Sequence, residues 1–158
     1  AAMVMVDLAT ELVAVEELRR PCYSRTGVLE SVQMVNFMSH ENFKVDLGPN
    51  VNIVSGPNGS GKSAIVAALQ LGLGTKTKDR GATLDAHVRH GQKEAKIVIR
   101  ILNYPPEFHG DVTDQYKPDL FGNVIIVERR IAGPASGQSS SRRSDYALKD
   151  VHGKFVEL

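Results

Sequence analysis

Hydrophobic and polar positions alternate along residues 28–37, which is the spacing of a β-strand with one buried face. A polar turn at residues 38–42 follows, and residues 43–47 then resume the alternation. Two alternating segments joined by a short polar turn are typical of a β-hairpin. Within the first segment the period of two places Val32 on one face and Phe37 on the other.

Later apolar segments predict further strands. Residues 51–54 and 124–127 are short and β-branched, which indicates buried strands, whereas residues 95–102 alternate. Residues 146–156 are typical of a closing hairpin turned at 152–153. Because most of these strands follow one another without a helix between them, the pattern predicts an α/β fold with an antiparallel β layer.

Helical spacing is confined to a few segments. Residues 64–69 are apolar and rich in good helix formers, and a glycine at or near residue 72 is expected to end that helix. A short helix is expected at residues 84–88. Residues 1–26 are expected to form a leader or a loosely attached amphipathic helix, which leaves residues 27–158 as the folded domain.

The sequence GPNGSGKS occupies residues 56–63, between the strand at 51–54 and the helix that follows. It fits the phosphate-loop pattern G-x-x-x-x-G-K-[ST] at every fixed position. A preceding strand and a following helix are the context in which this loop holds a nucleotide polyphosphate. Gly59 and Gly61 keep side chains out of the loop, so that backbone N–H groups can wrap the phosphates.

Polar side chains of this loop are candidate ligands for the nucleotide and its magnesium ion. Lys62 is expected to reach the β- and γ-phosphates, and the Ser63 hydroxyl to complete the Mg²⁺ shell. Asn58 and Ser60 would add hydrogen-bond donors. The alternative is a glycine-rich turn without a ligand, but such a turn needs neither a lysine nor a hydroxyl at these two positions.

Composition narrows the function classes only slightly. The 158 residues are 42% hydrophobic and 23% charged, which suits one globular domain with a core. The net charge of +1 gives no global attraction to nucleic acid or a membrane, and no apolar run is long enough to span a bilayer. Cys22 is the single cysteine, which excludes an intrachain disulfide and a thiolate zinc site.

Glu128 supports a competing interpretation. It follows the apolar run at residues 124–127, as an acid does in a second nucleotide-binding motif, where it would hold Mg²⁺ through water or activate the attacking water. The chain would then be a compact, self-contained NTPase. Any buried strand that reaches solvent at an acid has the same pattern, and Arg129 and Arg130 offer this acid ion partners. A structural role is therefore favoured.

Basic residues outnumber acids between positions 76 and 100. They could form a rim that contacts DNA phosphates without reading sequence, or a solvated face with scattered charge. An interaction module, in which nucleotide is structural and DNA or a partner protein is the ligand, therefore stays open. The basic residues are Lys76, Lys78, Arg80, Arg89, Lys93, Lys96 and Arg100.

A long run of this sequence resembles a known family. It is VNFMSHENFKVDLGPNVNIVSGPNGSGKSAIVAALQLGLG at residues 35–74, and it is similar to the amino-terminal half of the ATPase head of the structural maintenance of chromosomes (SMC) family. The resemblance extends over residues 27–158. Three features are most similar to the sixth subunit, the partner of the fifth in a DNA-repair complex: residues 36–40, the Asp-Arg-Gly connector at 79–81, and Tyr-Lys-Pro at 116–118 followed by residues 125–130.

The resemblance implies an ABC-type ATPase head assembled from the two ends of a long chain, which a coiled coil brings together. Two heads, the second of the fifth-subunit type, would sandwich two ATP molecules, and non-SMC subunits would complete the complex. It would act in the nucleus on single- and double-stranded DNA, in double-strand-break repair by homologous recombination and in replication-fork maintenance. A phosphate or DNA contact is implied for Arg80, and a base or ribose contact for His40. The loop residues implied to bind ATP and Mg²⁺ are Asn58, Gly59, Gly61, Lys62 and Ser63.

Other parts of the family's head have no counterpart in these 158 residues. They are the glutamine that completes the Mg²⁺ site, the signature serine motif, the carboxyl-terminal aspartate–glutamate pair, the coiled coil and the hinge. Phosphoryl transfer needs several such parts at once. We therefore expect a fragment or truncated form that binds ATP weakly alone and hydrolyses it only with the carboxyl-terminal half-head and a partner head.

Overall fold

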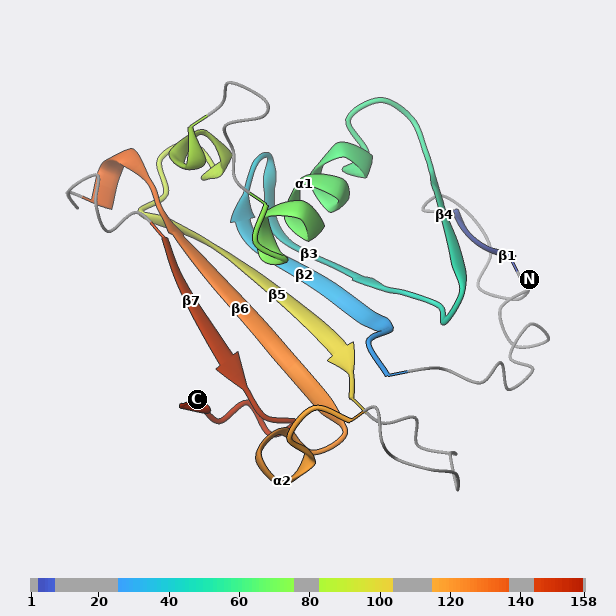
Figure 1. Cartoon of the computed structure of the whole chain (residues 1–158). Helices are drawn as coiled ribbons and strands as arrows, with labels where there is room; N and C mark the ends of the chain where they lie inside the picture. Colours follow the sequence, from blue (N-terminus) through green and yellow to red (C-terminus); the bar gives the residue numbers. More distant parts are fainter. Residues whose placement is uncertain (1–2, 8–25, 76–82, 104–114, 137–143, 158) are drawn as a thin grey trace.

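The computed structural model describes residues 3–7, 26–75, 83–103, 115–136 and 144–157. In these ranges no helix is long and apolar enough to cross a membrane. The elements run in the order β1 (Met3–Asp7), β2 (Leu29–Phe37), β3 (His40–Asp46), β4 (Val51–Ser55), α1 (Lys62–Gly72), the 3₁₀ turn η2 (Leu84–His87), β5 (Glu94–Leu102), α2 (Pro118–Phe121), β6 (Val124–Ala132), the 3₁₀ turn η3 (Pro134–Ser136) and β7 (Ser144–Lys149) (Figure 1).

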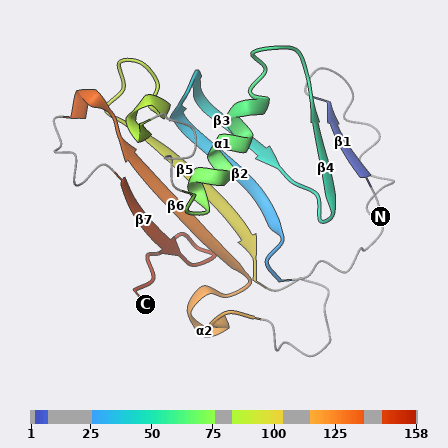
Figure 2. The ribbon, with the colours of Figure 1, turned by 45° about the horizontal axis from the view of Figure 1, so that its top comes forward.

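Five strands form one antiparallel sheet in the order β3-β2-β5-β6-β7. This confirms the predicted antiparallel layer. The chain leaves the sheet after β3, runs through β4 and α1, and returns as β5 beside β2. β4 stands outside the large sheet and pairs in parallel with β1, and Figure 2 shows this two-stranded ribbon on the far side of α1.

α1 covers one face of the five-stranded sheet and forms the core with it (Figure 1). Its buried residues recur every three or four positions, which gives a helix one apolar side. Gly72 brings the end of the helix against β5, because a Cβ there would overlap the side chain of Ile99. The core residues of the helix are Ala64, Ile65, Ala67, Ala68 and Leu71, and those of the central strands are Val32, Met34, Ala95, Ile97, Ile99 and Ile131.

The opposite side of the sheet, here called the outer face, is largely polar. Strand alternation places Glu128 and Arg130 there, between residues that point towards α1. Ion pairs cross this face: Arg100 Nε donates to Glu30 Oε2 at 2.6 Å, and Lys149 Nζ donates to Glu128 Oε2 at 2.7 Å. The two faces of one sheet therefore differ: one forms the core under α1, and the other carries these ion pairs beside the buried side chains of Val124 and Ile126.

The β2–β3 hairpin is tighter than its pattern predicts. β3 already begins at His40, so the turn is only two residues long and not the five predicted. Asn36 and Met38 have φ values of 50° and 52°, in the left-handed region that few non-glycine residues adopt. This break in the alternation turns Phe37 into the core, where it is fully buried, although the strict period placed it away from Val32.

Other elements differ from expectation in smaller ways. α2 has no counterpart among the helices predicted above, and the helix predicted at 84–88 is a single 3₁₀ turn. The closing hairpin has its turn, but its second arm is reduced to one bridge between Lys149 and Phe155. β1 lies within the segment expected to be a leader, and the residues that carry that segment's helical spacing, 8–25, lie outside the described residues.

Candidate phosphate-binding site

The glycine loop connects the end of β4 to the start of α1. Gly59 and Gly61 have φ values of 85° and 97°, which a glycine adopts without strain and other residues avoid. Gly61 is the N-cap of α1 and supplies no side chain to its free N–H groups, and the first turn of α1 contains no acid. The positive end of the helix is therefore open to an anion from outside the protein.

Lys62 points back into this loop. Its Nζ donates hydrogen bonds to the carbonyl oxygens of Gly56 at 2.5 Å and Pro57 at 2.7 Å, and lies 3.5 Å from Ser60 Oγ. A lysine ammonium can only donate hydrogen bonds, so the loop carbonyl oxygens accept them here, as the oxygens of a phosphate would. The Ser63 hydroxyl, one residue on, is on the exposed side of the helix start.

A cavity of about 190 Å³ lies at this loop, between the start of α1 and the β2–β3 turn. Met38 and Ser39 of the turn and His40 at the start of β3 contribute to its lining. His40 packs on the Phe43 ring with a centroid distance of 5.0 Å, which fixes the imidazole. A Cβ on Gly61 would lie 2.9 Å from His40 Nε2, so the histidine is in close contact with the helix start.

These residues fit a nucleotide phosphate chain. Two of the loop glycines have no room for a side chain. A Cβ at Gly56 would lie 2.8 Å from Ser60 Oγ, and a Cβ at Gly61 would collide with His40. The donors are backbone N–H groups, one ammonium and hydroxyls, which is the set that phosphate oxygens require. Among the described residues no three His, Cys, Asp or Glu side chains form a metal cluster.

Comparisons with known proteins agree with this architecture. The sequence model of the AAA domain family matches residues 31–142. Relatives named structural maintenance of chromosomes protein 6 are 42% identical over 137 residues in Saccharomyces cerevisiae, 38% over 134 in Dictyostelium discoideum and 36% over 136 in Homo sapiens, each covering 84% of this chain. The chain belongs to the SMC ATPases. It spans about a tenth of the length of these relatives, 10% or 11% of each.

Solved structures show the same fold for this SMC chain. An SMC ATPase studied for ATP-driven dimerization and DNA-stimulated activation superposes with a TM-score of 0.57 at 21% identity, covering 82% of this chain and 72% of that one. An Smc head from Pyrococcus furiosus, bound to the C-terminal domain of ScpA, gives 0.57 at 20% identity over 82% and 30%. The recombination mediator RecF with ATP gives 0.54 at 17% over 84% and 28%. The fold is therefore that of the amino-terminal lobe of an ABC-type ATPase head.

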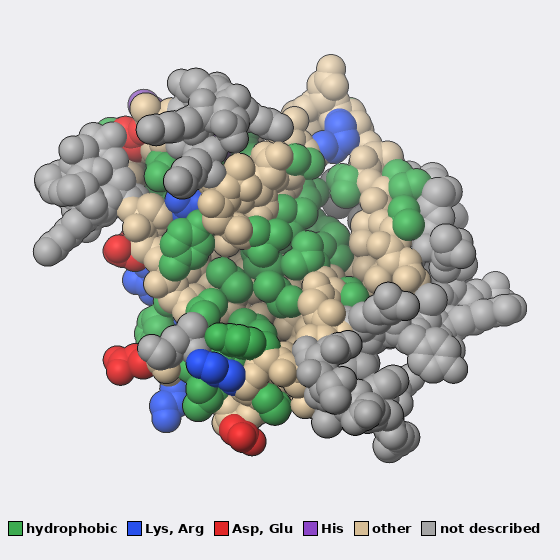
Figure 3. All heavy atoms as spheres, viewed as in Figure 1, with side chains coloured by type: hydrophobic (Ala, Val, Ile, Leu, Met, Phe, Trp, Pro, Cys, Tyr) green, Lys and Arg blue, Asp and Glu red, His purple; other side chains and the backbone are tan. Residues whose placement is uncertain are grey.

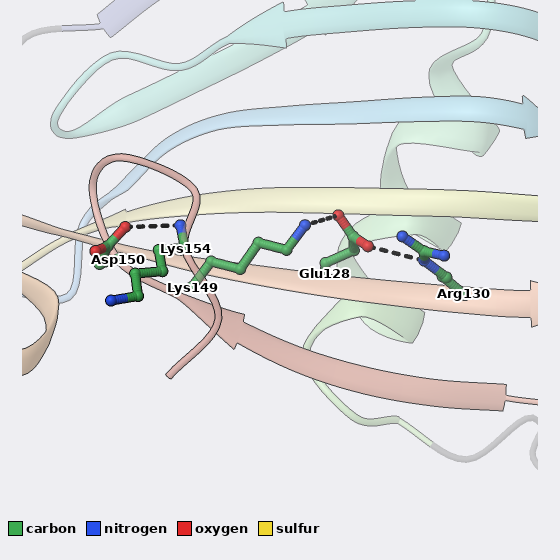
Figure 4. Close-up of polar contacts among 5 residues, drawn as sticks. All are labelled: Glu128, Arg130, Lys149, Asp150 and Lys154. Carbon is green, nitrogen blue, oxygen red and sulfur yellow. Dashed lines mark hydrogen bonds and ion pairs between the residues drawn. The ribbon is translucent and has the colours of Figure 1, made fainter. Parts of the chain in front are cut away.

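Glu128 lies away from the phosphate loop of this SMC chain. Its neighbour Arg129 bonds to the end of α1, so the alternating Glu128 side chain is on the outer face. There it accepts hydrogen bonds from Lys149 Nζ at 2.7 Å and Arg130 Nε at 2.9 Å (Figure 4). Burial raises the pKa of the Glu128 carboxyl, but the hydrogen bonds and charges of Lys149 and Arg130 outweigh it and lower that pKa overall. This geometry favours the structural interpretation of Glu128 over the catalytic one.

The basic segment is only partly described. Arg80, together with Lys76 and Lys78, lies outside the described residues. Of the others, Arg89 pairs with Glu41 at 3.1 Å and Arg100 pairs with Glu30. Both arginines are thus engaged within the protein, and the DNA-facing rim stays a prediction.

Proposed function

We propose that this SMC chain is the ATP-binding half-head of a chromosome-maintenance subunit. The observation that carries the proposal is the phosphate loop itself: Lys62 is turned into a loop of backbone carbonyls at the open N-terminus of α1. An ammonium held at a helix N-terminus, directly after a glycine-rich loop, suits a polyphosphate and has no comparable use in a structural turn.

Each loop residue has a role in this proposal. Backbone N–H groups of the loop and the first turn of α1 would donate to the phosphates, with Asn58 and Ser60 as further donors. Lys62 would exchange its loop carbonyls for β- and γ-phosphate oxygens. Ser63 would hold the magnesium ion, which supplies charge neutralisation at the phosphates when bound. His40, beside Gly61, would contact the base or ribose.

Hydrolysis requires a further part. None of the described residues that line the cavity at the loop is a carboxylate that could activate water. The one buried acid of β6, Glu128, is held by two cations on the outer face. A general base must therefore come from another segment, and the carboxyl-terminal half of the same head is the segment that the family resemblance supplies.

The α1 side of the molecule has room for that segment. Val66, on α1, and Leu73, which caps the end of that helix, are 49% and 52% exposed. Figure 3 shows hydrophobic side chains gathered over the centre of this side. Within the described ranges β4 pairs with β1 alone, in parallel, and parallel strands are normally buried in larger sheets with both faces covered. We expect the carboxyl-terminal half-head to cover this surface.

The cellular role extends the same proposal. Relatives over most of this chain carry the name of the sixth SMC protein in fungi, plants and animals. The chain would accordingly work with an SMC head of the fifth-subunit type, with non-SMC subunits and with DNA, on chromosomes in the nucleus. Its process would be double-strand-break repair by homologous recombination and replication-fork maintenance.

The test is ATP hydrolysis by the chain alone and after addition of the carboxyl-terminal half-head and a partner head, with Lys62→Ala and Glu128→Gln as paired variants. We expect turnover only with both parts added, abolished in Lys62→Ala and retained in Glu128→Gln. Turnover by the chain alone that disappears in Glu128→Gln would contradict the split head and make this a self-contained NTPase.

A further inference from the structure

A buried arginine touches the far end of the phosphate-loop helix. Arg129, on β6, is 6% exposed. Its Nη1 donates to the carbonyl oxygen of Leu71 at 2.5 Å, and the hydroxyl of Tyr146, on β7, donates to the same oxygen at 2.8 Å. Leu71 is the last residue but one of α1, so two strands of the sheet converge on the helix C-terminus.

The charge of Arg129 is balanced without an acid. Among the described residues no carboxylate forms an ion pair with it. Its Nε donates to Ser144 Oγ at 2.8 Å, and its guanidinium lies 4.7 Å from the centre of the Tyr146 ring. Burial lowers the pKa of Arg129, which shows that its charge is partly desolvated, and burial raises the pKa of Tyr146, which keeps its hydroxyl a donor.

The negative end of α1 is the remaining partner of this charge. α1 has no basic residue in its own last turn, where a cation normally stabilises the helix dipole. Arg129 supplies that cation from the sheet. Burying an arginine costs solvation free energy unless hydrogen bonds replace the lost water, and here one of the replacing bonds holds the carboxyl end of α1.

We propose that Arg129 and Tyr146 form an anchor that positions the phosphate loop from the opposite end of α1. The helix has 11 residues, so its ends are about 16 Å apart, and a rigid helix transmits a shift at one end to the other. Gly72 against Ile99 sets the distance between helix and sheet, and the anchor sets the position of the helix along its axis. Lys62 and Ser63, in the first turn, are thereby held at a fixed height beside β4.

This inference rests on the proposed function, because positioning is measured as ATP affinity. Arg129→Met removes the charge and both donors at similar volume, and Tyr146→Phe removes one hydroxyl and keeps the ring. Arg130→Met is the matched control: the adjacent arginine, half exposed, is on the outer face and bonded to Glu128. Arg129→Lys keeps the positive charge but replaces the planar guanidinium, which donates from several nitrogens, with one ammonium group.

Two measurements on the full 158-residue chain decide the matter, both at a temperature where circular dichroism shows every variant folded. We expect the dissociation constant for Mg–ATP to rise about tenfold in Arg129→Met and two- to threefold in Tyr146→Phe, with partial recovery in Arg129→Lys and no change in Arg130→Met. Without nucleotide, amide hydrogen exchange at residues 69–75 should become faster in the first two variants only.

The outcomes separate this proposal from the one it rests on. Unchanged exchange at residues 69–75 in Arg129→Met and Tyr146→Phe would overturn the anchor, whether or not ATP binds. Faster exchange with unchanged ATP affinity would also overturn it, because the contact would then be structural only. If Arg129→Met does not fold, Tyr146→Phe carries the same test. Failure of the wild-type chain to bind Mg–ATP, with exchange altered as expected, would instead contradict the proposed function.

Discussion

Neighbouring residues of β6 serve opposite sides of the sheet. Arg129 points to α1 and holds the end of the phosphate-loop helix, whereas Glu128 and Arg130, on either side of it, form an ion pair on the outer face. An acid directly after an apolar strand matches a nucleotide-binding motif in sequence, yet the pleat of the strand decides which face it serves. The proposed phosphate site lies with the glycine loop, and the outer face carries charge pairs.

The cavities of the two faces differ in the same way. The outer-face cleft, next to Glu128 and Phe155, has a volume of about 580 Å³, and the cavity at the phosphate loop has only about 190 Å³. The smaller cavity contains a helix N-terminus, an ammonium and a hydroxyl directed to one place, whereas the carboxylate in the larger one is already paired. Size alone would therefore favour the outer-face cleft, whereas the convergence of donors favours the cavity at the loop as the phosphate site.

Core substitutions should show the largest difference between the faces. Ile99 is fully buried under α1, and its neighbour Val98 is half-buried on the outer face. We expect Ile99→Ala to lower the free energy of unfolding by about 4 kcal/mol and Val98→Ala by about 1 kcal/mol. Urea denaturation followed by circular dichroism measures both, and equal losses would contradict the assignment of the core to one face.

Removal of a lysine charge should weaken ATP binding when the lysine is in the glycine loop and not when it is on the outer face. Lys62→Ala is expected to weaken Mg–ATP binding about a hundredfold, since it deletes a charge-assisted contact to the phosphates. Lys96→Ala is the control, because Lys96 alternates with core residues of β5 and lies on the outer face. Isothermal titration would show no change for the control. A comparable loss in both variants would mean that general charge, and not the loop, attracts the nucleotide.

Glu128→Gln should reduce stability and leave ATP binding intact. The substitution leaves Lys149, whose side chain is 16% exposed, without its anionic partner. We expect a loss of about 2–3 kcal/mol in the free energy of unfolding. Titration of folded Glu128→Gln with Mg–ATP should give the wild-type affinity, and a strong loss of affinity would restore the catalytic interpretation of Glu128.

The same ion pair predicts a pH dependence. The pKa of Glu128 is lowered from its usual 4.5 in the folded state, so its contribution to stability is complete above that value and disappears as the pH falls through the folded pKa. Stability of the wild-type chain should therefore fall more steeply below about pH 4.5 than that of Glu128→Gln. Parallel pH profiles for the two proteins would show that Glu128 has no stabilising charge interaction.

The smallest expected effect concerns the edge of the phosphate site. His40→Ala should weaken Mg–ATP binding about threefold, because it removes one contact beside the helix start. His152→Ala, in the exposed turn before Phe155, is the matched control and should bind as the wild type does. An unchanged affinity in His40→Ala would remove this histidine from the site.

Local pattern predicted much of the fold, and long-range contacts account for what it missed. The alternation of β2 and β5 and the glycine loop before α1 are properties of short segments, so the strands, the helix and the motif could be found in the sequence. The positive φ at Asn36 interrupts the two-residue alternation of β2, and the sequence contains no signal of that interruption. The contacts of Leu71 with Arg129 and Tyr146 join residues 58 and 75 positions apart. β1 and β4 also pair across a long stretch of the chain, so no local pattern predicts that they are neighbours.

Nuclear magnetic resonance of the 158-residue chain titrated with Mg–ATP tests most directly whether the nucleotide binds at the glycine loop and not on the outer face. Backbone amide shifts should change at residues 56–64 and in the β2–β3 turn at 38–40, and should stay constant around Glu128, Lys149 and Phe155. Shifts concentrated at the outer-face cleft, with the glycine loop unchanged, would contradict the account.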